Sequence, residues 1–243
     1  MAINKYRFAE LNVEMETHGE LLDSRAEKYL FDFSGKPDIT LRVPVDFIEK
    51  QKQVYPNLTF EELDYLVTGA GFYYYLSDFN GFMLHSSTVV YNNKAYMFSA
   101  PCGTGKSTHT SLWCKYLGED KAFILNDDKP AVRVFDNGIF AYGTPFSGKT
   151  SQSENKKVQV GGIVLIERGT DNTITRTTEL IEAIGILNWQ SNYFSQKEKI
   201  TKKLDLFSEV IKHVPLYKLS CDISKEAFVT SFECLTGEKF QEN

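Results

Sequence analysis

The segment from Ala100 to Thr108 constrains the fold more than any other part of this 243-residue chain. Its sequence, APCGTGKST, matches the Walker A pattern G-x-x-x-x-G-K-[ST] at every defined position except the first, where alanine replaces glycine. An apolar run, Ala95 to Phe98, precedes the segment, and apolar residues at helical spacing follow it as far as Leu117. A strand, a glycine-rich turn and a helix in this order are typical of a loop that binds the phosphates of a nucleotide.

Each residue type in this loop suits phosphate binding. Gly103 and Gly105 permit the backbone angles that turn successive N–H groups inward, and the following helix points its positive end at the phosphates. Lys106 can reach the β- and γ-phosphates, and Ser107 can offer its hydroxyl to Mg²⁺. A glycine-rich turn with an incidental lysine is the alternative interpretation. The residues predicted to bind the nucleotide are Ala100, Pro101, Cys102, Gly103, Thr104, Gly105, Lys106, Ser107 and Thr108.

A pair of acidic residues follows about twenty positions after the loop. Asp127 and Asp128 stand just after a short apolar strand predicted over Ala122–Leu125. Adjacent carboxylates repel each other unless a cation or a proton is present, and Mg²⁺ prefers carboxylates together with phosphate oxygens. We therefore predict a magnesium site formed by Ser107, Asp127 and Asp128. The alternative is a solvated turn, because Asp-Asp-Lys-Pro is favourable turn chemistry by itself.

The rest of the chain alternates between strand and helix patterns, which predicts an α/β fold with a mixed sheet and flanking helices. Two hairpins are expected, one at Asn92-Asn93 and one at Asp136-Asn137-Gly138. The predicted strands are Phe82–Tyr91, Lys94–Phe98, Ala122–Leu125, Ala131–Phe135, Ile139–Tyr142, Gly161–Glu167 and Leu216–Cys221. The predicted helices are Thr108–Leu117, Leu180–Trp189, Lys203–Val214 and a last one from Ser224 to near Gly237.

Residues 1–78 carry weaker patterns than residues 79–243, the predicted catalytic core. Loose alternation predicts antiparallel strands at Tyr6–Glu16, Lys28–Phe33 and Asp38–Pro44. Thr59-Phe60-Glu61-Glu62 is a capping box that begins a helix reaching towards Tyr75. No linker rich in Pro, Gly or Ser separates the two regions, so we expect the N-terminal strands to extend the main sheet rather than form an accessory lobe.

Charge and hydropathy exclude several classes of function. The chain has 27 Lys+Arg, 32 Asp+Glu and a net charge of −5, so the basic surface that nucleic-acid binding needs is not expected. No stretch approaches the roughly 18 apolar residues of a membrane helix, and residues 1–11 lack the apolar core of a secretory signal. A cytoplasmic location is expected. The four cysteines form no C-x-x-C pair and are expected to be free thiols.

A strand carrying His85, a hairpin, the phosphate loop and the Asp pair follow one another in the order found in a known superfamily. This order resembles the catalytic domain of HPr kinase/phosphorylase and, more distantly, phosphoenolpyruvate carboxykinase. The resemblance implies an HPr kinase-like P-loop core and transfer of the γ-phosphoryl group of ATP, with Mg²⁺, to a hydroxyl. It implies that Asp127 takes the proton of that hydroxyl, that Asp128 is the neighbouring metal-associated carboxylate, and that His85 lies beside Asp127. The candidate catalytic residues are Asp127, His85 and Lys106, although His85 can also be interpreted as a core histidine.

The acceptor is left open by the sequence. Relatives act on serine in a protein, in a peptide or as the free amino acid. The alternatives are an ATPase or GTPase that uses water and a non-catalytic nucleotide sensor.

Gly143–Lys149 is interpreted either as a loop that closes on the acceptor or as a surface turn. Lys149, Arg133 and Arg168 are further candidate cations for the γ-phosphate. The R-G-x-x-E-x-R-G-x-G segment of the family is matched only at Glu167–Gly169, so neither its phosphorylase activity nor its hexamer is implied. A homo-oligomer of another kind is possible.

Overall fold

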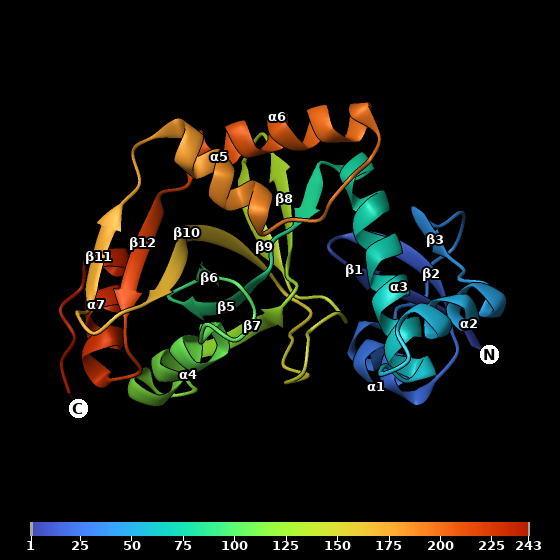
Figure 1. Ribbon diagram of the computed structural model, residues 1–243, viewed down its shortest axis with the longest axis horizontal. Helices are drawn as coiled ribbons and strands as arrows, with labels where there is room; N and C mark the ends of the chain where they lie inside the picture. The colour runs from blue at the N-terminus through green and yellow to red at the C-terminus, as the bar shows by residue number, and fades with distance from the viewer. Residues whose placement is uncertain (1, 243) are drawn as a thin grey trace.

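Two separate β-sheets organise residues 2–242, the part of the chain that the computed structural model describes (Figure 1). One sheet has three strands from the N-terminal region, and the main sheet has nine. The predicted α/β class, a mixed sheet with flanking helices, is confirmed. No helix within these residues has both the length and the apolar character that a bilayer-spanning segment requires.

The N-terminal sheet is not part of the main sheet, so the expectation that its strands extend the main sheet is wrong. β1 (Ala2–Phe8) and β2 (Leu11–Thr17) form an antiparallel hairpin, and the short β3 (Ile39–Leu41) pairs with β2 in parallel rather than antiparallel orientation. The predicted strand at Lys28–Phe33 is also wrong, because a single isolated bridge connects this segment to β1.

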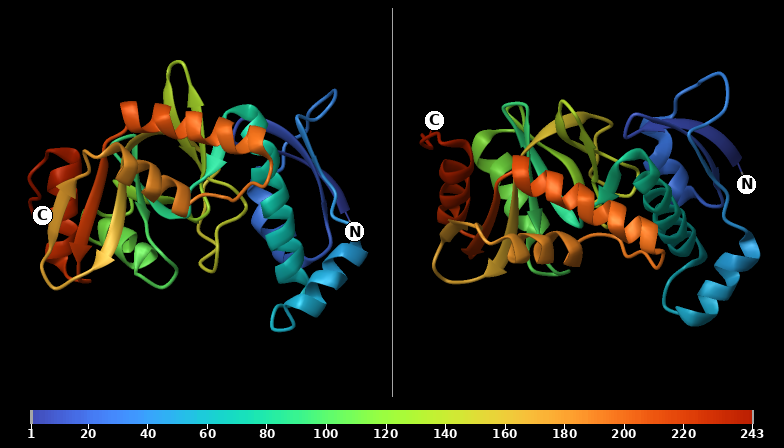
Figure 2. Two further views of the ribbon diagram at one scale, coloured as in Figure 1. Left: turned by 45° about the horizontal axis from the view of Figure 1, so that its top comes forward. Right: turned by 90° about the horizontal axis from the view of Figure 1, so that it is seen from above.

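Helix α3 (Phe60–Leu76) begins as the capping box predicts. The hydroxyl of Thr59 accepts the N–H of Glu62 at 3.1 Å, and the Glu62 carboxylate accepts the N–H of Thr59 at 2.7 Å. The helix contacts both β3 and the main sheet, so it lies at the junction of the two sheets (Figure 2). Its Phe72 stacks on Phe146 of the core, with ring centroids 5.9 Å apart. The division at residue 78 stays a prediction.

The main sheet is built around its longest strand, β10 (Lys157–Arg168). The other strands are β4 (Gly81–Met83), β5 (Ser86–Tyr91), β6 (Lys94–Ser99), β7 (Ala122–Asp128), β8 (Ala131–Phe135), β9 (Gly138–Tyr142), β11 (Thr173–Arg176) and β12 (Leu216–Cys221). Their order is β4-β8-β9-β10-β6-β5-β7, with β12 beside β10 and β11 beside β12. Because β10 pairs in turn with β9, β6 and β12, parallel and antiparallel ladders occur in the same sheet.

The predicted strand Phe82–Tyr91 is interrupted at Leu84 and His85, and it forms the two strands β4 and β5. The backbone N–H of His85 donates to the carbonyl of Gln190 at 2.6 Å, and Leu84 makes an isolated bridge to Ser191. A distant segment therefore takes the backbone partners of this stretch, and His85 stands just before β5 rather than within a strand.

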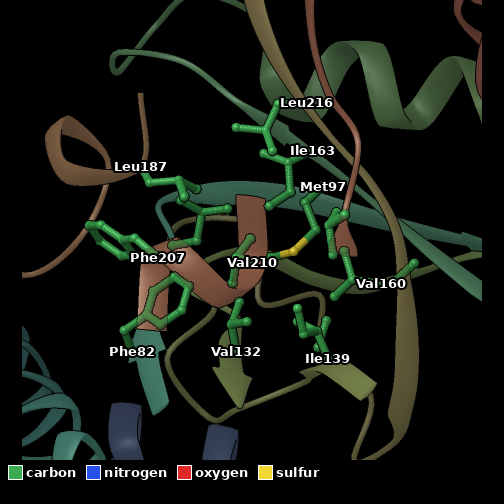
Figure 3. Packing of buried hydrophobic residues seen from close by; sticks show 14 of the residues in the cluster. Phe82, Met97, Val132, Ile139, Val160, Ile163, Leu187, Phe207, Val210 and Leu216 are labelled. Atoms are coloured by element: carbon green, nitrogen blue, oxygen red, sulfur yellow. The ribbon is translucent and has the colours of Figure 1, made fainter. Parts of the chain in front are cut away.

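Helices cover both sides of the main sheet (Figure 1). α5 (Leu180–Trp189) and α6 (Lys197–His213) pack on one side. There the rings of Phe82 and Phe207 meet edge to face at 5.0 Å, and Val210 lies beside them (Figure 3). α4 (Lys106–Leu117) and α7 (Lys225–Thr236) pack on the other side, where Trp113 contacts Phe228 at 5.9 Å. The remaining helices, α1 (Glu20–Ala26) and α2 (Val45–Val54), were not predicted.

Candidate functional site

Three adjacent strands bring the predicted site residues to one edge of the main sheet. The middle strand, β5, runs antiparallel to both β6 and β7. Its first residue, Ser86, pairs with Ser99 at the end of β6 and with Asp128 at the end of β7. The loop that follows β6, the Asp pair and His85 therefore meet at the same edge of the sheet.

Residues 100–105 form a loop between β6 and α4, and residues 106–108 are the first turn of α4. Gly103 and Gly105 have φ angles of +79° and +119°, in the region that favours glycine. A Cβ at either position would meet no atom within 4 Å, so both glycines serve backbone conformation rather than close packing. The N-terminus of α4 follows directly, which gives the loop the exposed N–H groups and positive helix end of an anion site.

Arg168, at the end of β10, supports this loop from outside. Its Nε donates to the carbonyl of Thr104 at 3.2 Å, and Nη2 donates to the carbonyl of Gly103. The guanidinium thus binds loop carbonyls, and these contacts place it against the backbone of the loop. Arg133 lies elsewhere, because it donates to the carbonyls of Ala9 and Phe79 and joins the two sheets.

Lys106 is buried at the base of the loop, with 7% of its surface exposed. Its Nζ donates to the carbonyl of Ala100 at 2.9 Å and lies 3.1 Å from Nε2 of His85. Burial lowers the pKa of Lys106, while the nearby carboxylate of Asp128 opposes that shift. The side chain is therefore held by the loop itself, through the carbonyl of Ala100.

The carboxylate of Asp127 is bound by a hydroxyl on each side. Ser107 donates its hydroxyl to Oδ1 at 2.7 Å, and Thr150 donates its hydroxyl to Oδ2 at 2.7 Å. Asp127 is only 3% exposed. The contact with Ser107 connects the carboxylate to the first turn of α4, and the contact with Thr150 connects it to the segment on the opposite side.

Asp128 forms a separate cluster with His85 and Lys129. Its Oδ1 lies 2.9 Å from Nε2 of His85, and its Oδ2 pairs with the ammonium of Lys129. Burial raises the pKa of Asp128, but the hydrogen bond with His85 and the charge of Lys129 outweigh burial and hold the pKa well below its ordinary value. The backbone φ of Asp128 is +112°, an uncommon conformation for a non-glycine residue.

His85 contacts Asp128 rather than Asp127, which corrects the position expected from the resemblance. Its Nδ1 lies 3.2 Å from Oε1 of Gln190, an acceptor that favours a proton on Nδ1. Nε2 lies within hydrogen-bond distance of both Nζ of Lys106 and Oδ1 of Asp128. His85 therefore lies between the lysine and the carboxylate.

The segment Gly143–Lys149 is a surface turn only at its end. Thr144, Phe146 and Ser147 are fully or almost fully buried, whereas Lys149 is exposed. Thr144 receives the side-chain amide of Asn126 through its backbone carbonyl at 3.0 Å. The first part of the segment is thus a packed wall of the site, and Lys149 has no carboxylate within ion-pair distance among residues 2–242.

A mostly apolar cavity of about 360 Å³ opens beside the Asp pair. Lys129 lines this cavity and also pairs with Asp128, and the hydroxyl of Tyr73 donates to the carbonyl of Lys129. Lys129 therefore connects the cavity to the cluster of His85, Asp128 and Lys129. Its walls include Tyr65, Ala70, Tyr73, Lys129, Phe146 and Tyr193.

Sequence reasoning did not single out Thr150, Lys129, Gln190 or Tyr65. Lys129 could have been found, because it directly follows the Asp pair in the Asp-Asp-Lys-Pro segment, for which a solvated turn was the alternative interpretation. The other three come from α3, the segment after Lys149 and the end of α5, and no local pattern marks them. Long-range packing brings them to the site.

The donor set fits a magnesium ion held together with phosphate. Ser107 and Asp127 are in contact, and Asp128 is the next residue along β7. Mg²⁺ in proteins is usually bound by one or two carboxylates plus phosphate oxygens and water, rather than by a complete protein cage. No group of three or more His, Cys, Asp or Glu side chains has metal-binding geometry in the described part of the chain.

No protein-family model matches this chain, and no curated protein matches it either. Among solved structures, the chain is similar to the HPr(Ser) kinase/phosphatase from Coxiella burnetii, with 9% sequence identity and a TM-score of 0.37. The alignment covers 64% of this chain and 99% of that chain. Similarity at this level assigns no role to any residue of this chain.

Proposed function

We propose that the protein is a kinase that uses ATP and Mg²⁺ to transfer the γ-phosphoryl group to a hydroxyl of an acceptor. The observation that carries this proposal is the pair of hydrogen bonds at Asp127. One carboxylate oxygen accepts a hydroxyl from the phosphate loop, and the other accepts a hydroxyl from outside it. A carboxylate with these two neighbours lies between the predicted nucleotide site and a hydroxyl group, where it can accept the proton of that hydroxyl.

The phosphate loop would bind the nucleotide through its backbone N–H groups and Lys106. Ser107, Asp127 and Asp128 would hold Mg²⁺, which when bound neutralises charge on the phosphates. Lys106 would stabilise the negative charge of the group in transfer, and its burial strengthens that effect because little water screens it.

On the acceptor side, Asp127 would orient the attacking hydroxyl and take its proton. His85 touches Lys106 and Asp128 rather than the acceptor, so we assign it a positioning role. Serine in a protein, serine in a peptide and free serine all carry the required hydroxyl. The apolar cavity next to Lys129 favours an acceptor with an apolar group close to that hydroxyl.

The proposal is tested by following labelled phosphate from γ-labelled ATP with Mg²⁺. HPr, free serine, a serine peptide with an apolar neighbour and a host-cell extract would each be offered as acceptor. Asp127→Asn should remove transfer but retain nucleotide binding, because it loses the negative charge and the proton-accepting carboxylate but leaves the loop intact. Asp136→Asn, the same change at an exposed hairpin, is the matched control and should keep the parental rate.

Three other outcomes would contradict the proposal. Transfer by Asp127→Asn at the parental rate would remove Asp127 from the mechanism. Release of inorganic phosphate without any labelled acceptor would favour an ATPase or GTPase that uses water. Tight binding of Mg-ATP with neither product would favour a nucleotide sensor.

A further inference from the structure

The chain already holds one of its own hydroxyls where the proposed acceptor would bind. Thr150 Oγ1 donates to Oδ2 of Asp127 at 2.7 Å, while Ser107 of the phosphate loop occupies Oδ1 at the same distance. Thr150 is therefore separated from the phosphate loop by a single carboxylate. A hydroxyl bound to a general base at this distance is in reach for proton transfer.

The segment that carries Thr150 is fixed on both sides. Before it, the N–H of Gly148 donates to the hydroxyl of Tyr65 at 3.0 Å, and the φ of Gly148 is +65°. After it, the N–H of Asp127 donates to the carbonyl of Gln152 at 3.0 Å. The proposed base thus binds this segment through both its backbone and its side chain.

Position 148 needs glycine for a second reason. A Cβ there would lie 2.6 Å from the Cβ of Asp128, which is too close for a side chain. Glycine at position 148 therefore allows the backbone of this segment to pack against the side chain of Asp128. Thr150 is an exposed residue, and its hydroxyl is bonded to the carboxylate of Asp127.

We infer that Thr150 is a phosphoryl acceptor, so that the protein phosphorylates itself within one chain; this inference rests on the proposed kinase activity. The Thr150 oxygen forms a bond to the γ-phosphorus of ATP, the bond between that phosphorus and the β,γ-bridging oxygen breaks, and ADP leaves. The hydroxyl proton passes to Asp127. Reactants and products balance with Mg-ATP as the only co-reactant.

The other nearby hydroxyls fit this role less well. Ser107 lies on the first turn of α4, where the helix backbone fixes it on the phosphate side of Asp127. Ser153 is buried, with 4% of its surface exposed. Ser151 is exposed and adjacent to Thr150, but the two carboxylate oxygens of Asp127 accept from Ser107 and Thr150, so Ser151 is the matched control.

Phosphorylation at Thr150 would change the site. A phosphothreonine carries close to two negative charges and would lie against Asp127, with Asp128 next to it. Like-charge repulsion would displace the segment from the carboxylate. Displacement would free Oδ2 of Asp127 for the hydroxyl of an outside acceptor, so the modified form should transfer phosphate to such an acceptor faster than the unmodified form.

The test uses the full chain incubated with Mg-ATP, with the modified residue located by peptide mass spectrometry. We expect one phosphate on Thr150, formed at a first-order rate that does not change with protein concentration. Thr150→Val should lose this phosphate completely, Thr150→Ser should retain it, and Ser151→Ala should behave as the parent. Asp127→Asn should lose it as well.

The two proposals fail in different ways. Transfer to an outside acceptor with no phosphate on Thr150 would overturn the inference and leave the kinase proposal intact. Phosphate at Ser151 or elsewhere, or a rate proportional to protein concentration, would also overturn self-phosphorylation within one chain. Mg-ATP binding with no phosphate on Thr150 and no transfer to any acceptor would contradict both proposals.

Discussion

The two sides of the candidate site are built in different ways. The phosphate side is one continuous segment, residues 100–108, that connects β6 to α4 and uses backbone N–H groups with one buried lysine. The acceptor side comprises Tyr65, Tyr73, Lys129, Phe146, Gly148 and Thr150, which come from separate parts of the chain. The phosphate side therefore depends on one local segment, whereas the acceptor side depends on several segments that can change separately. Substitutions on the first side should remove activity, and substitutions on the second should change which hydroxyl is used.

The largest expected effect is on the phosphate side. Lys106→Met keeps most of the side-chain volume but removes the charge, so transfer should fall by about 100-fold or more. The measurement is the initial rate of label transfer, with Lys121→Met as a control at an exposed position. If the rate of the variant differs from that of the parent by less than about twofold, Lys106 does not have the proposed role.

A second prediction concerns the stability of the phosphate-side helix, α4. His109 is 3% exposed, and burial lowers its pKa to about 4. An unfolded histidine titrates near pH 6.5, so the unfolded chain binds more protons between these two values. The stability contributed by neutral His109 is fully present above about pH 6.5 and is lost as the pH falls towards 4, by on the order of 3 kcal/mol.

His109→Gln should flatten this dependence, because glutamine does not titrate and can still bond to Ser231, which lies 2.9 Å from the His109 ring. The measurement is the free energy of unfolding in urea at several pH values, for the parent and the variant. Other groups titrate in both proteins and cancel in the difference. An equal slope for the two proteins would show that His109 is not the titrating group.

On the acceptor side, filling the apolar cavity should weaken binding of the acceptor without changing binding of ATP. Ala70 is exposed on α3 and lines the cavity, so Ala70→Phe places a ring in it without a change to the core. We expect the KM for an acceptor with an apolar group to rise about tenfold, with the KM for ATP unchanged. Gly185→Phe is the bulk-matched control, since a side chain there meets open space. A parallel rise in both KM values would mean that the cavity is not specific to the acceptor.

The smallest expected effect is on the stability of the acceptor-side helix, α3. Thr59→Ala removes the hydroxyl that accepts the N–H of Glu62, which should lower the free energy of unfolding by about 1 kcal/mol. Chemical denaturation measures this change, and Thr178→Ala at an exposed position is the control. If both variants unfold at the same denaturant concentration, the capping box contributes nothing measurable.

The phosphate side could be predicted from the sequence because its strand, loop and helix are contiguous. Gly103, Gly105 and Lys106 act through local backbone geometry, so their spacing alone carries the information. The same holds for the capping box at Thr59. The N-terminal sheet was predicted wrongly because its pairing is long-range: β3 has three residues, and no local pattern says which strand it joins.

The contact between His85 and Asp128 could not be predicted, because it depends on the register between β5 and β7. The pairing of β5 with β7 shifts by one residue between Thr88 and Val89, where β7 contains a bulge. Without that shift, Ser86 would pair with Asp127; with it, Ser86 pairs with Asp128. A one-residue change of register decides which acid lies beside the histidine, and neither composition nor spacing reveals it.

Phe146 has a consequence for how the protein is made. Its ring packs against Phe8, Tyr65 and Phe72 of the N-terminal region, at centroid distances of 6.3, 5.7 and 5.9 Å. Phe146 is synthesised roughly 70 residues after the end of α3, and at about 5–20 residues per second that is a delay of several seconds on the ribosome. During this interval the aromatic side chains of the nascent N-terminal region can pack on one another but lack the ring of Phe146, so a chaperone would have apolar surface to protect at this stage of biosynthesis.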